Sequence, residues 1–147
     1  MKRSEALIPL SHEHHQALFV AQKLRRATPQ NAAAARDEFL AFWRSGGEAH
    51  FQAEEEILLP AWSRRAPADH ESVVKILADH VELRRMAADL AGDPLETPDE
   101  LHALGDRLHD HVRYEERVFF PLVEQTLPAQ DLERILDSLE ERAAAAT

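Results

Sequence analysis

Apolar residues recur at intervals of three and four positions along most of the chain. This spacing places side chains on one face of an α-helix. Proline, glycine and capping residues divide the pattern into five segments, and no alternating stretch of β-branched residues interrupts them. The pattern therefore predicts an all-α fold.

The predicted helices cover residues 11–28, 31–60, 69–92, 97–125 and 128–145. Ser11 is the expected N-cap of the first helix. Gly46-Gly47 and Pro60 should bend or loosen the second helix, and the third should stop at Gly92-Asp93-Pro94. Thr97-Pro98 gives the fourth helix a capping residue followed by a proline in its first turn.

Four long helices joined by short connections favour an antiparallel four-helix bundle. The chain length fits a single domain, residues 1–147, with the bundle over about 11–125. The additional short C-terminal helix, about residues 128–145, carries an apolar stripe that includes Leu132, Ile135 and Leu139. Because no polar ligand lies on this stripe, we expect it to pack against the bundle or to bind a protein partner, such as a second copy in a homodimer.

Some polar residues fall on the predicted inner faces of the helices. His14 lies within the apolar face of the first helix, and His80 shares the face of the third helix with Leu77. The fourth helix carries His111 and Val118 on its inner face. A buried imidazole needs partners for its ring nitrogens, so these positions require a chemical reason.

The composition narrows that chemistry. The chain has 147 residues, 44% hydrophobic and 30% charged, which is ordinary for a soluble globular protein. Its formal net charge of −10 disfavours binding to nucleic acid or to an anionic membrane. Cys is absent, which excludes disulfides, thiolate zinc sites and iron–sulfur clusters and leaves only N and O ligands. Residues 1–10 lack the sustained apolar stretch of a signal peptide or membrane span, so we expect a cytoplasmic protein.

Two segments of the chain follow one plan: residues 50–60 read HFQAEEEILLP and residues 111–121 read HVRYEERVFFP. In each, a His is followed four positions later by a Glu, so a helix places His50 beside Glu54 and His111 beside Glu115. Roughly one such pair is expected by chance at this composition. The shared extension, a second Glu and then a Pro six positions after the first Glu, indicates an internal repeat.

The repeat has a larger form, because Glu13-His14 precedes the first segment and Asp79-His80 precedes the second. Each half supplies a single His and one His-x-x-x-Glu, which together give the candidate metal ligands His14, His50, Glu54, His80, His111 and Glu115. If both Glu side chains bridge, each of two ions takes two His and two carboxylate oxygens, with positions left open for a small ligand. These donors suit iron, two per chain, with manganese or zinc possible.

His15 is the alternative to His14 as the first-helix ligand, but its helical neighbours Ser11, Phe19 and Gln22 form a poorer apolar stripe. Trp43, Ile57, Val118 and Ala21 are expected either to wall the metal site or to pack in the core. Glu55, Glu56 and Glu116 are expected at the surface or around the ligands.

These residues resemble the hemerythrin-like, or HHE cation-binding, family over most of residues 11–125. The motifs that carry the resemblance are the acid-His pairs ending in His14 and His80 and the two His-x-x-x-Glu segments. The resemblance implies a four-helix bundle holding a non-haem di-iron centre that has carboxylate bridges and reacts with O2, NO or peroxide. It also implies metal-binding roles for the six candidate ligands.

The chain departs from the oxygen-carrying members of that family. They have a second His one turn before the third-helix ligand, where this chain has Ile76, and an Asp at the fifth position after the fourth-helix His, where this chain has Glu115 at the fourth. The pattern of four His and two Glu is closer to bacterial hemerythrin-like proteins linked to nitrosative or oxidative stress and iron handling. A ferritin-like centre would use Glu-x-x-His, which is the reverse order.

Three functions follow from this reading. The first is a di-iron protein that binds O2, NO or peroxide for sensing, storage or a stress response. The second is an enzyme that turns over peroxide or NO, and whether the protein is an enzyme stays open. The third is a metal-stabilised module whose C-terminal helix binds a protein partner.

Overall fold

The structure is a computed structural model that describes residues 2–92 and 97–146. Its elements are α1 (Ile8–Arg25), α2 (Ala32–Phe42), η1 (Trp43–Gly47), α3 (Glu48–Ala53), η2 (Glu54–Leu58), α4 (Leu59–Ser63), α5 (Glu71–Gly92), α6 (Asp99–Tyr114), η3 (Glu115–Phe119), α7 (Phe120–Thr126) and α8 (Ala129–Ala145), where η marks a π-helical turn. Strands do not occur in the described part of the chain. The all-α prediction is confirmed.

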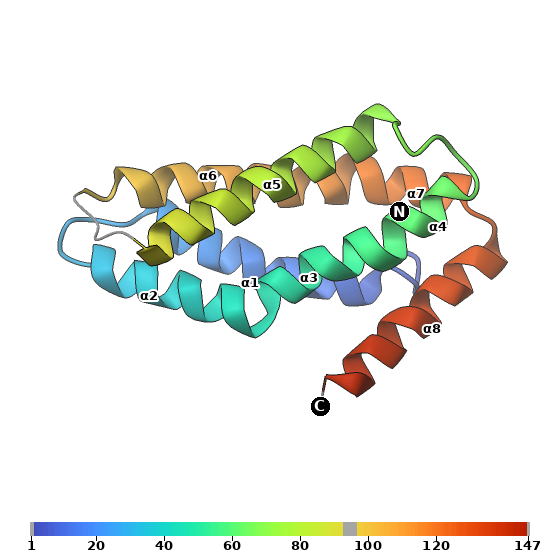
Figure 1. Ribbon diagram of the computed structural model, residues 1–147, viewed down its shortest axis with the longest axis horizontal. Helices are drawn as coiled ribbons and strands as arrows, with labels where there is room; N and C mark the ends of the chain where they lie inside the picture. The colour runs from blue at the N-terminus through green and yellow to red at the C-terminus, as the bar shows by residue number, and fades with distance from the viewer. Residues whose placement is uncertain (1, 93–96, 147) are drawn as a thin grey trace.

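The long helices lie side by side and alternate in direction (Figure 1). The segments from α2 to α4 and from α6 to α7 form two continuous rods, and α1 packs mainly against α6. The predicted third helix corresponds to α5, which ends at Gly92, whereas the stop expected at Asp93-Pro94 lies outside the described residues. Within the described residues, none of the helices has the length and apolar character needed to cross a membrane.

The start of the first helix was predicted wrongly. The helix begins at Ile8 rather than after Ser11, with Pro9 in its first turn. Proline is tolerated there because the N–H groups of the first turn have no acceptor within the helix. Leu7, just before the helix, is fully buried and anchors this end. The Ser11 hydroxyl donates instead to Glu116 Oε2 at 2.7 Å.

Two apolar clusters fill the bundle. One contains Leu24, Phe39 and Leu104. The other contains Leu10 and Trp62. The candidate ligands lie where one cluster gives way to the other along each long helix, so the polar residues lie at mid-height in the bundle.

The π-helical turns η2 and η3 occupy the same position in the two repeats. The backbone N–H of Leu59 donates to the Glu54 carbonyl, and that of Phe120 donates to the Glu115 carbonyl, five residues back in each case. Each turn ends two positions before a proline, Pro60 or Pro121, which lacks an N–H and cannot continue a regular helical ladder. The wider turn absorbs this defect without interrupting the rod.

The extra residue in each turn changes which side chains face inward. Val118 was predicted on the inner face but is 44% exposed, whereas Phe119 is fully buried. Ile57 in the other repeat is likewise only partly buried, and Leu58 is fully buried. Leu77 was also predicted wrongly and is 40% exposed, because the buried face of α5 is centred on Ile76, His80 and Leu83.

Gly46 and Gly47 loosen the second rod, as expected, through the π-helical turn η1. A Cβ on Gly47 would lie 2.9 Å from Phe42 Cε2 and 3.0 Å from Trp43 Cε3, so only glycine fits at this position without displacing both rings. A Cβ on Gly46 would meet no atom within 4 Å.

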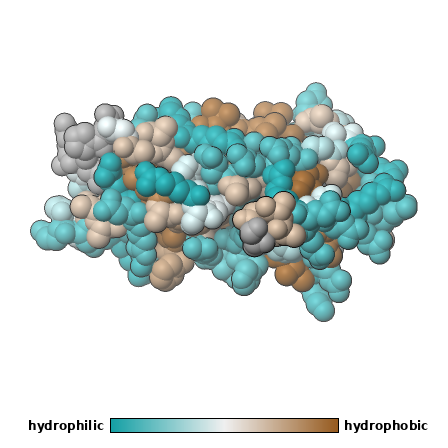
Figure 2. Space-filling view, turned by 60° about the horizontal axis from the view of Figure 1, so that its bottom comes forward, coloured by the Kyte–Doolittle hydropathy of each residue, from teal (hydrophilic) through white to brown (hydrophobic). Residues whose placement is uncertain are grey.

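Helix α8 leaves the end of the bundle at an angle (Figure 1). Its Ile135 and Leu139 side chains are buried against the second apolar cluster. Asp131 accepts two hydrogen bonds from Arg65, at 2.7 and 3.1 Å. The apolar stripe of the C-terminal helix therefore packs on its own chain. Figure 2 shows that hydrophilic side chains cover most of one face of the molecule and that hydrophobic side chains surface there in separate patches.

Candidate metal centre

The structure brings all six candidate ligands together inside the bundle. His14 comes from α1, His50 from α3, His80 from α5 and His111 from α6, while Glu54 and Glu115 are the first residues of the turns η2 and η3. None of the six is more than 7% exposed. His15 is exposed, so the bundle interior contains His14 and not the alternative.

Each of the four imidazoles is held from behind by a carboxylate on its Nδ1 atom. Glu116 Oε2 lies 2.6 Å from Nδ1 of His14, and Glu55 Oε2 lies 2.6 Å from Nδ1 of His80. Glu13 and Asp79 hold the other two rings, with Oε1 of Glu13 at 3.0 Å from His50 Nδ1 and Oδ2 of Asp79 at 3.1 Å from His111 Nδ1. Because an ionised carboxylate only accepts, each Nδ1 is the donor in these bonds.

The exchange of partners between helices is regular. The acid of each acid-His pair, Glu13 or Asp79, holds the His of the adjacent His-x-x-x-Glu segment. The second Glu of each segment, Glu55 or Glu116, holds the single His of an acid-His pair. Such carboxylate–imidazole pairs fix the ring orientation and tautomer of metal-binding histidines. The expectation that Glu55 and Glu116 lie around the ligands is confirmed by these contacts.

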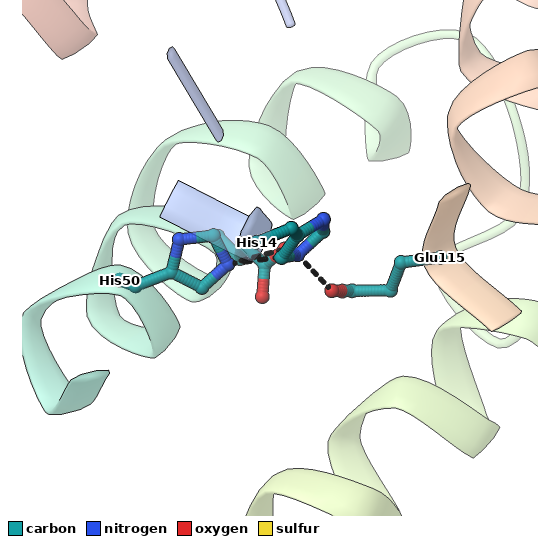
Figure 3. Close-up of side chains that lie close together, drawn as sticks. His14, His50 and Glu115 are labelled. Atoms are coloured by element: carbon teal, nitrogen blue, oxygen red, sulfur yellow. Dashed lines mark hydrogen bonds and ion pairs between the residues drawn. The ribbon is translucent and has the colours of Figure 1, made fainter. Parts of the chain in front are cut away.

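The Nε2 atoms converge on the two buried carboxylates, and Figure 3 shows one part of this arrangement, His14 with its partners His50 and Glu115. Nε2 of His14 lies 3.0 Å from Glu115 Oε1 and 3.1 Å from Nε2 of His50. Glu54 presents Oε2 to His50 Nε2 at 3.3 Å and Oε1 to His80 Nε2 at 3.2 Å. The two oxygens of Glu54 therefore face opposite halves of the site.

Within the described residues, a set of buried polar atoms at the centre lacks hydrogen-bond partners: Glu54 Oε1 and Oε2, His80 Nε2, His111 Nε2 and Glu115 Oε2. Leaving such atoms unpaired in a protein interior is unfavourable. The ligand atoms form two groups, one of His14 and His50 and one of His80 and His111, which both include Glu54 and Glu115, and the atoms of each group lie within 4.8 Å of one another. The donor set fits two metal ions that share two carboxylates.

Aromatic rings pack against the imidazoles and limit their movement. Phe51 stacks on His80 with ring centroids 3.9 Å apart and an interplanar angle of 5°. Phe120 stacks on His14 at 5.3 Å and 16°. Both Phe residues belong to the apolar clusters, so the core positions the ligand rings directly.

The buried carboxylates raise the pKa of His111 and of His50 in the centre without a metal. Burial lowers the pKa of His111, but the Glu115 charge and hydrogen bonds to Asp79 and Glu115 raise it by more than burial lowers it, to about 10. Burial also lowers the pKa of His50, but the charge of Glu54 and hydrogen bonds to Glu13 and Glu54 leave it well above its usual range. Burial would raise the pKa of the Glu115 carboxyl, but His111 and His14 hold it well below its usual range. These shifts favour a proton on His50 and His111 in the metal-free centre, and a metal ion binding there would have to displace those protons.

A small cavity of about 40 Å³ adjoins His14, His50 and His111. Its apolar wall includes Trp43 and Ala17. Trp43 was expected either to wall the metal site or to pack in the core, and it lines this cavity beside the site. Ala21, Ile57 and Val118 do not line it. Ala21 is instead fully buried in the apolar core, the other alternative expected for it.

Two basic residues near the centre were missed by sequence reasoning. Arg84 donates to both oxygens of Glu55, at 2.7 and 3.2 Å. Arg3 donates to the Glu116 carboxylate at 3.3 Å. Arg84 follows His80 by one helical turn, a spacing that could have indicated it, whereas no local pattern connects Arg3 with Glu116.

The sequence matches the hemerythrin HHE cation binding domain over residues 7–123. The chain therefore belongs to the hemerythrin family, and the bundle with its His and Glu cluster is a cation-binding domain of that family. Neither a curated protein nor a solved structure matches the chain closely enough to extend the comparison.

Proposed function

We propose that this protein holds two iron ions between the paired imidazoles and binds or reacts with O2, NO or peroxide there. His14 and His50 would hold one ion, His80 and His111 the other, and Glu54 and Glu115 would serve both. The observation that carries the proposal is the group of unpaired buried atoms at the centre, all of them on these ligands. Manganese and zinc accept similar donors, so the choice of iron rests on the resemblance to the hemerythrin-like family, which implies a non-haem di-iron centre.

The shared role of Glu54 is supported by its geometry. Its two oxygens are directed to imidazoles of different halves, at 3.3 Å from His50 Nε2 and 3.2 Å from His80 Nε2. A carboxylate that served one ion alone would have no reason to lie between both pairs. Glu115 shows the same behaviour through Oε1, which lies 3.0 Å from His14 Nε2 and 3.4 Å from His111 Nε2.

The surrounding residues prepare the ligands. The four carboxylates on the Nδ1 atoms keep the protons on that side of each ring, so the Nε2 lone pairs are directed into the centre. The stacked Phe51 and Phe120 rings hold two of the imidazoles in place and keep water from reaching the centre on those sides.

A reduced iron pair would supply electrons to a small oxidising ligand or a coordination position for NO. The chain's contribution is to limit which molecules reach the ions. The cavity of about 40 Å³ beside His14, His50 and His111 has room for only a few water-sized molecules. A diatomic molecule or a peroxide fits this volume, whereas a large organic substrate does not.

Metal content and reactivity test the proposal together. Protein produced with adequate iron and purified in air should contain iron as its main metal and absorb in the near ultraviolet through ligand-to-ferric charge transfer. After anaerobic reduction, adding O2, NO or peroxide should change the absorption spectrum of the reduced protein during or soon after mixing. Protein that contains only zinc, or iron whose spectrum none of the three ligands changes, would contradict the proposal.

A further inference from the structure

The N-terminal segment contacts the metal centre through one side chain, Arg3. Its Nη2 atom donates to the Glu116 backbone carbonyl at 2.8 Å and to Glu116 Oε1 at 3.3 Å, while Nη1 donates to Glu124 Oε1 at 2.8 Å. The guanidinium also lies over the Phe120 ring, 5.5 Å from its centroid. The backbone N–H of Ser4 adds a further hydrogen bond to Glu124.

The Glu116 carbonyl is available to Arg3 because of the π-helical turn. In η3 the Phe120 N–H donates to the Glu115 carbonyl. The next residue, Pro121, has no N–H to offer. The carbonyl of Glu116 is therefore left without a helical donor, and a buried or part-buried carbonyl needs one. The Arg3 guanidinium supplies it.

Glu116 transmits this contact to a candidate ligand. Its Oε2 atom accepts from Nδ1 of His14 at 2.6 Å and from the Ser11 hydroxyl at 2.7 Å. Phe120, which lies beneath the Arg3 guanidinium, stacks on the same imidazole. Arg3 thus reaches His14 through the Glu116 carboxylate, and the Phe120 ring contacts both groups.

The other half of the centre has a matching chain of contacts. Arg84 binds Glu55, Glu55 holds His80, and the Phe51 ring contacts both the Arg84 guanidinium and the His80 ring. The difference lies in where each arginine comes from. Arg84 is part of α5 inside the bundle, whereas Arg3 precedes α1 and lies outside residues 7–123, which match the family.

We propose that Arg3 is a positioning residue and that the N-terminal segment is a strap controlling one of the two metal positions. This inference rests on the proposed two-ion centre. With Arg3 in place, Glu116 is fixed against His14, and the His14–His50 position has its full affinity. When the segment is released, Glu116 loses its anchor, His14 loses its orientation, and that position weakens while the His80–His111 position keeps Arg84 and Glu55. The two ions therefore differ in how firmly the protein holds them.

The test is an anaerobic titration of metal-free full-length protein with Co²⁺, followed by its visible absorption and by competition with a chelator. The variants are Arg3→Ala, Arg84→Ala as its counterpart and Arg85→Ala as the control. Among the described residues, the ion pairs of Arg85 are those with Glu82 and Asp89, which lie away from the centre. Loss of a carboxylate partner behind a metal-bound His weakens affinity about 10- to 100-fold, so we expect Arg3→Ala to weaken one Co²⁺ by about tenfold.

A double-mutant cycle with Glu116→Gln separates positioning from a general effect of the N-terminus on folding. If Arg3 acts through Glu116, Arg3→Ala should cause little further loss of Co²⁺ affinity in that background but should add its full effect to Glu55→Gln. The melting temperature of the metal-free Arg3→Ala variant should stay within a few degrees of that of wild type.

The outcomes are distinct. Wild-type protein that binds no Co²⁺ would contradict the proposed metal function itself. Wild-type protein that binds two Co²⁺ ions while Arg3→Ala binds both with unchanged affinity would overturn only the strap. If Arg3→Ala lowered Co²⁺ affinity equally with and without Glu116→Gln, the strap would also be overturned, because Arg3 would then act by another route. One weakened ion, one unchanged ion and a non-additive cycle would establish it.

Discussion

The metal-free protein should lose stability as the pH rises from 6.5 toward 10. In the folded chain the pKa of His111 is raised from 6.5 to about 10, because Glu115 and Asp79 outweigh the effect of burial. Below pH 6.5 both the folded and the unfolded chain hold this proton, so the stabilising contribution is complete. Above pH 6.5 the unfolded chain releases the proton while the folded chain keeps it, and the contribution is lost by about pH 10.

The size of this effect follows from the pKa difference. Each pH unit across the window removes about 1.4 kcal/mol for His111, and the complete shift corresponds to at most about 5 kcal/mol. His14 and His50 have pKa values raised in the same direction and should steepen the decline. Since small proteins have a free energy of unfolding of only about 5–15 kcal/mol, the change is large enough to measure with ease.

Urea unfolding of chelator-treated protein at pH 6.5, 8 and 9.5, followed by circular dichroism, measures the decline directly. The midpoint should fall with pH while the slope of free energy against urea stays constant. His111→Gln should make the decline shallower by about 1.4 kcal/mol per pH unit. His109→Gln should leave it unchanged, because His109 pairs only with its exposed neighbour Asp110 among the residues that the structure describes. A stability that stays level or rises between pH 6.5 and 9.5 would refute the proposed charge pattern of the centre.

Three further predictions concern the metals. Glu54→Gln or Glu115→Gln should weaken both ions by more than about 100-fold, whereas His14→Ala should weaken mainly one, as measured by metal analysis after equilibrium dialysis; a Glu variant that keeps one ion at full occupancy would show that the carboxylate is not shared. Ile76→His should place an imidazole one turn before His80, fill an open iron position and slow the reaction with NO or peroxide in stopped-flow measurements; an unchanged spectrum and rate would mean that this part of α5 does not face the ions. Chelation should lower the melting temperature, and Fe²⁺ added anaerobically at a thousandfold excess over its Kd should restore about 4 kcal/mol per ion, since ligand binding stabilises the folded state; calorimetry that shows equal melting with and without metal would contradict this linkage.

The candidate ligands could be predicted from the sequence because their signals are local. A His and a Glu four positions apart must share a helix face, and the duplication of the motif distinguishes His50–Glu54 and His111–Glu115 from chance pairs. The choice of His14 over His15 also followed from helical periodicity, and the structure buries the former and exposes the latter. The helical bundle itself followed from the same periodicity.

The error at Val118 arose where the helix is not a regular α-helix. A period of 3.6 residues, continued past Glu115, places Val118 inside, but the π-helical turn adds a residue and buries Phe119 instead. Pro121 was visible in the sequence and is the physical cause, but a proline alone does not distinguish a π-helical turn from a simple bend. The contact between Arg3 and Glu116 joins residues 113 positions apart, and no local periodicity contains such information.

The central claim is a pair of metal positions that share two carboxylates, and the number of ions bound tests it most directly. Metal-free protein should be titrated anaerobically with Fe²⁺, with bound and free iron separated and quantified at each step. Binding that saturates at two Fe²⁺ per chain is the result that the four imidazoles, Glu54 and Glu115 predict. Saturation at one Fe²⁺ per chain, or no binding above that of a variant lacking both Glu54 and Glu115, would contradict the shared two-ion centre.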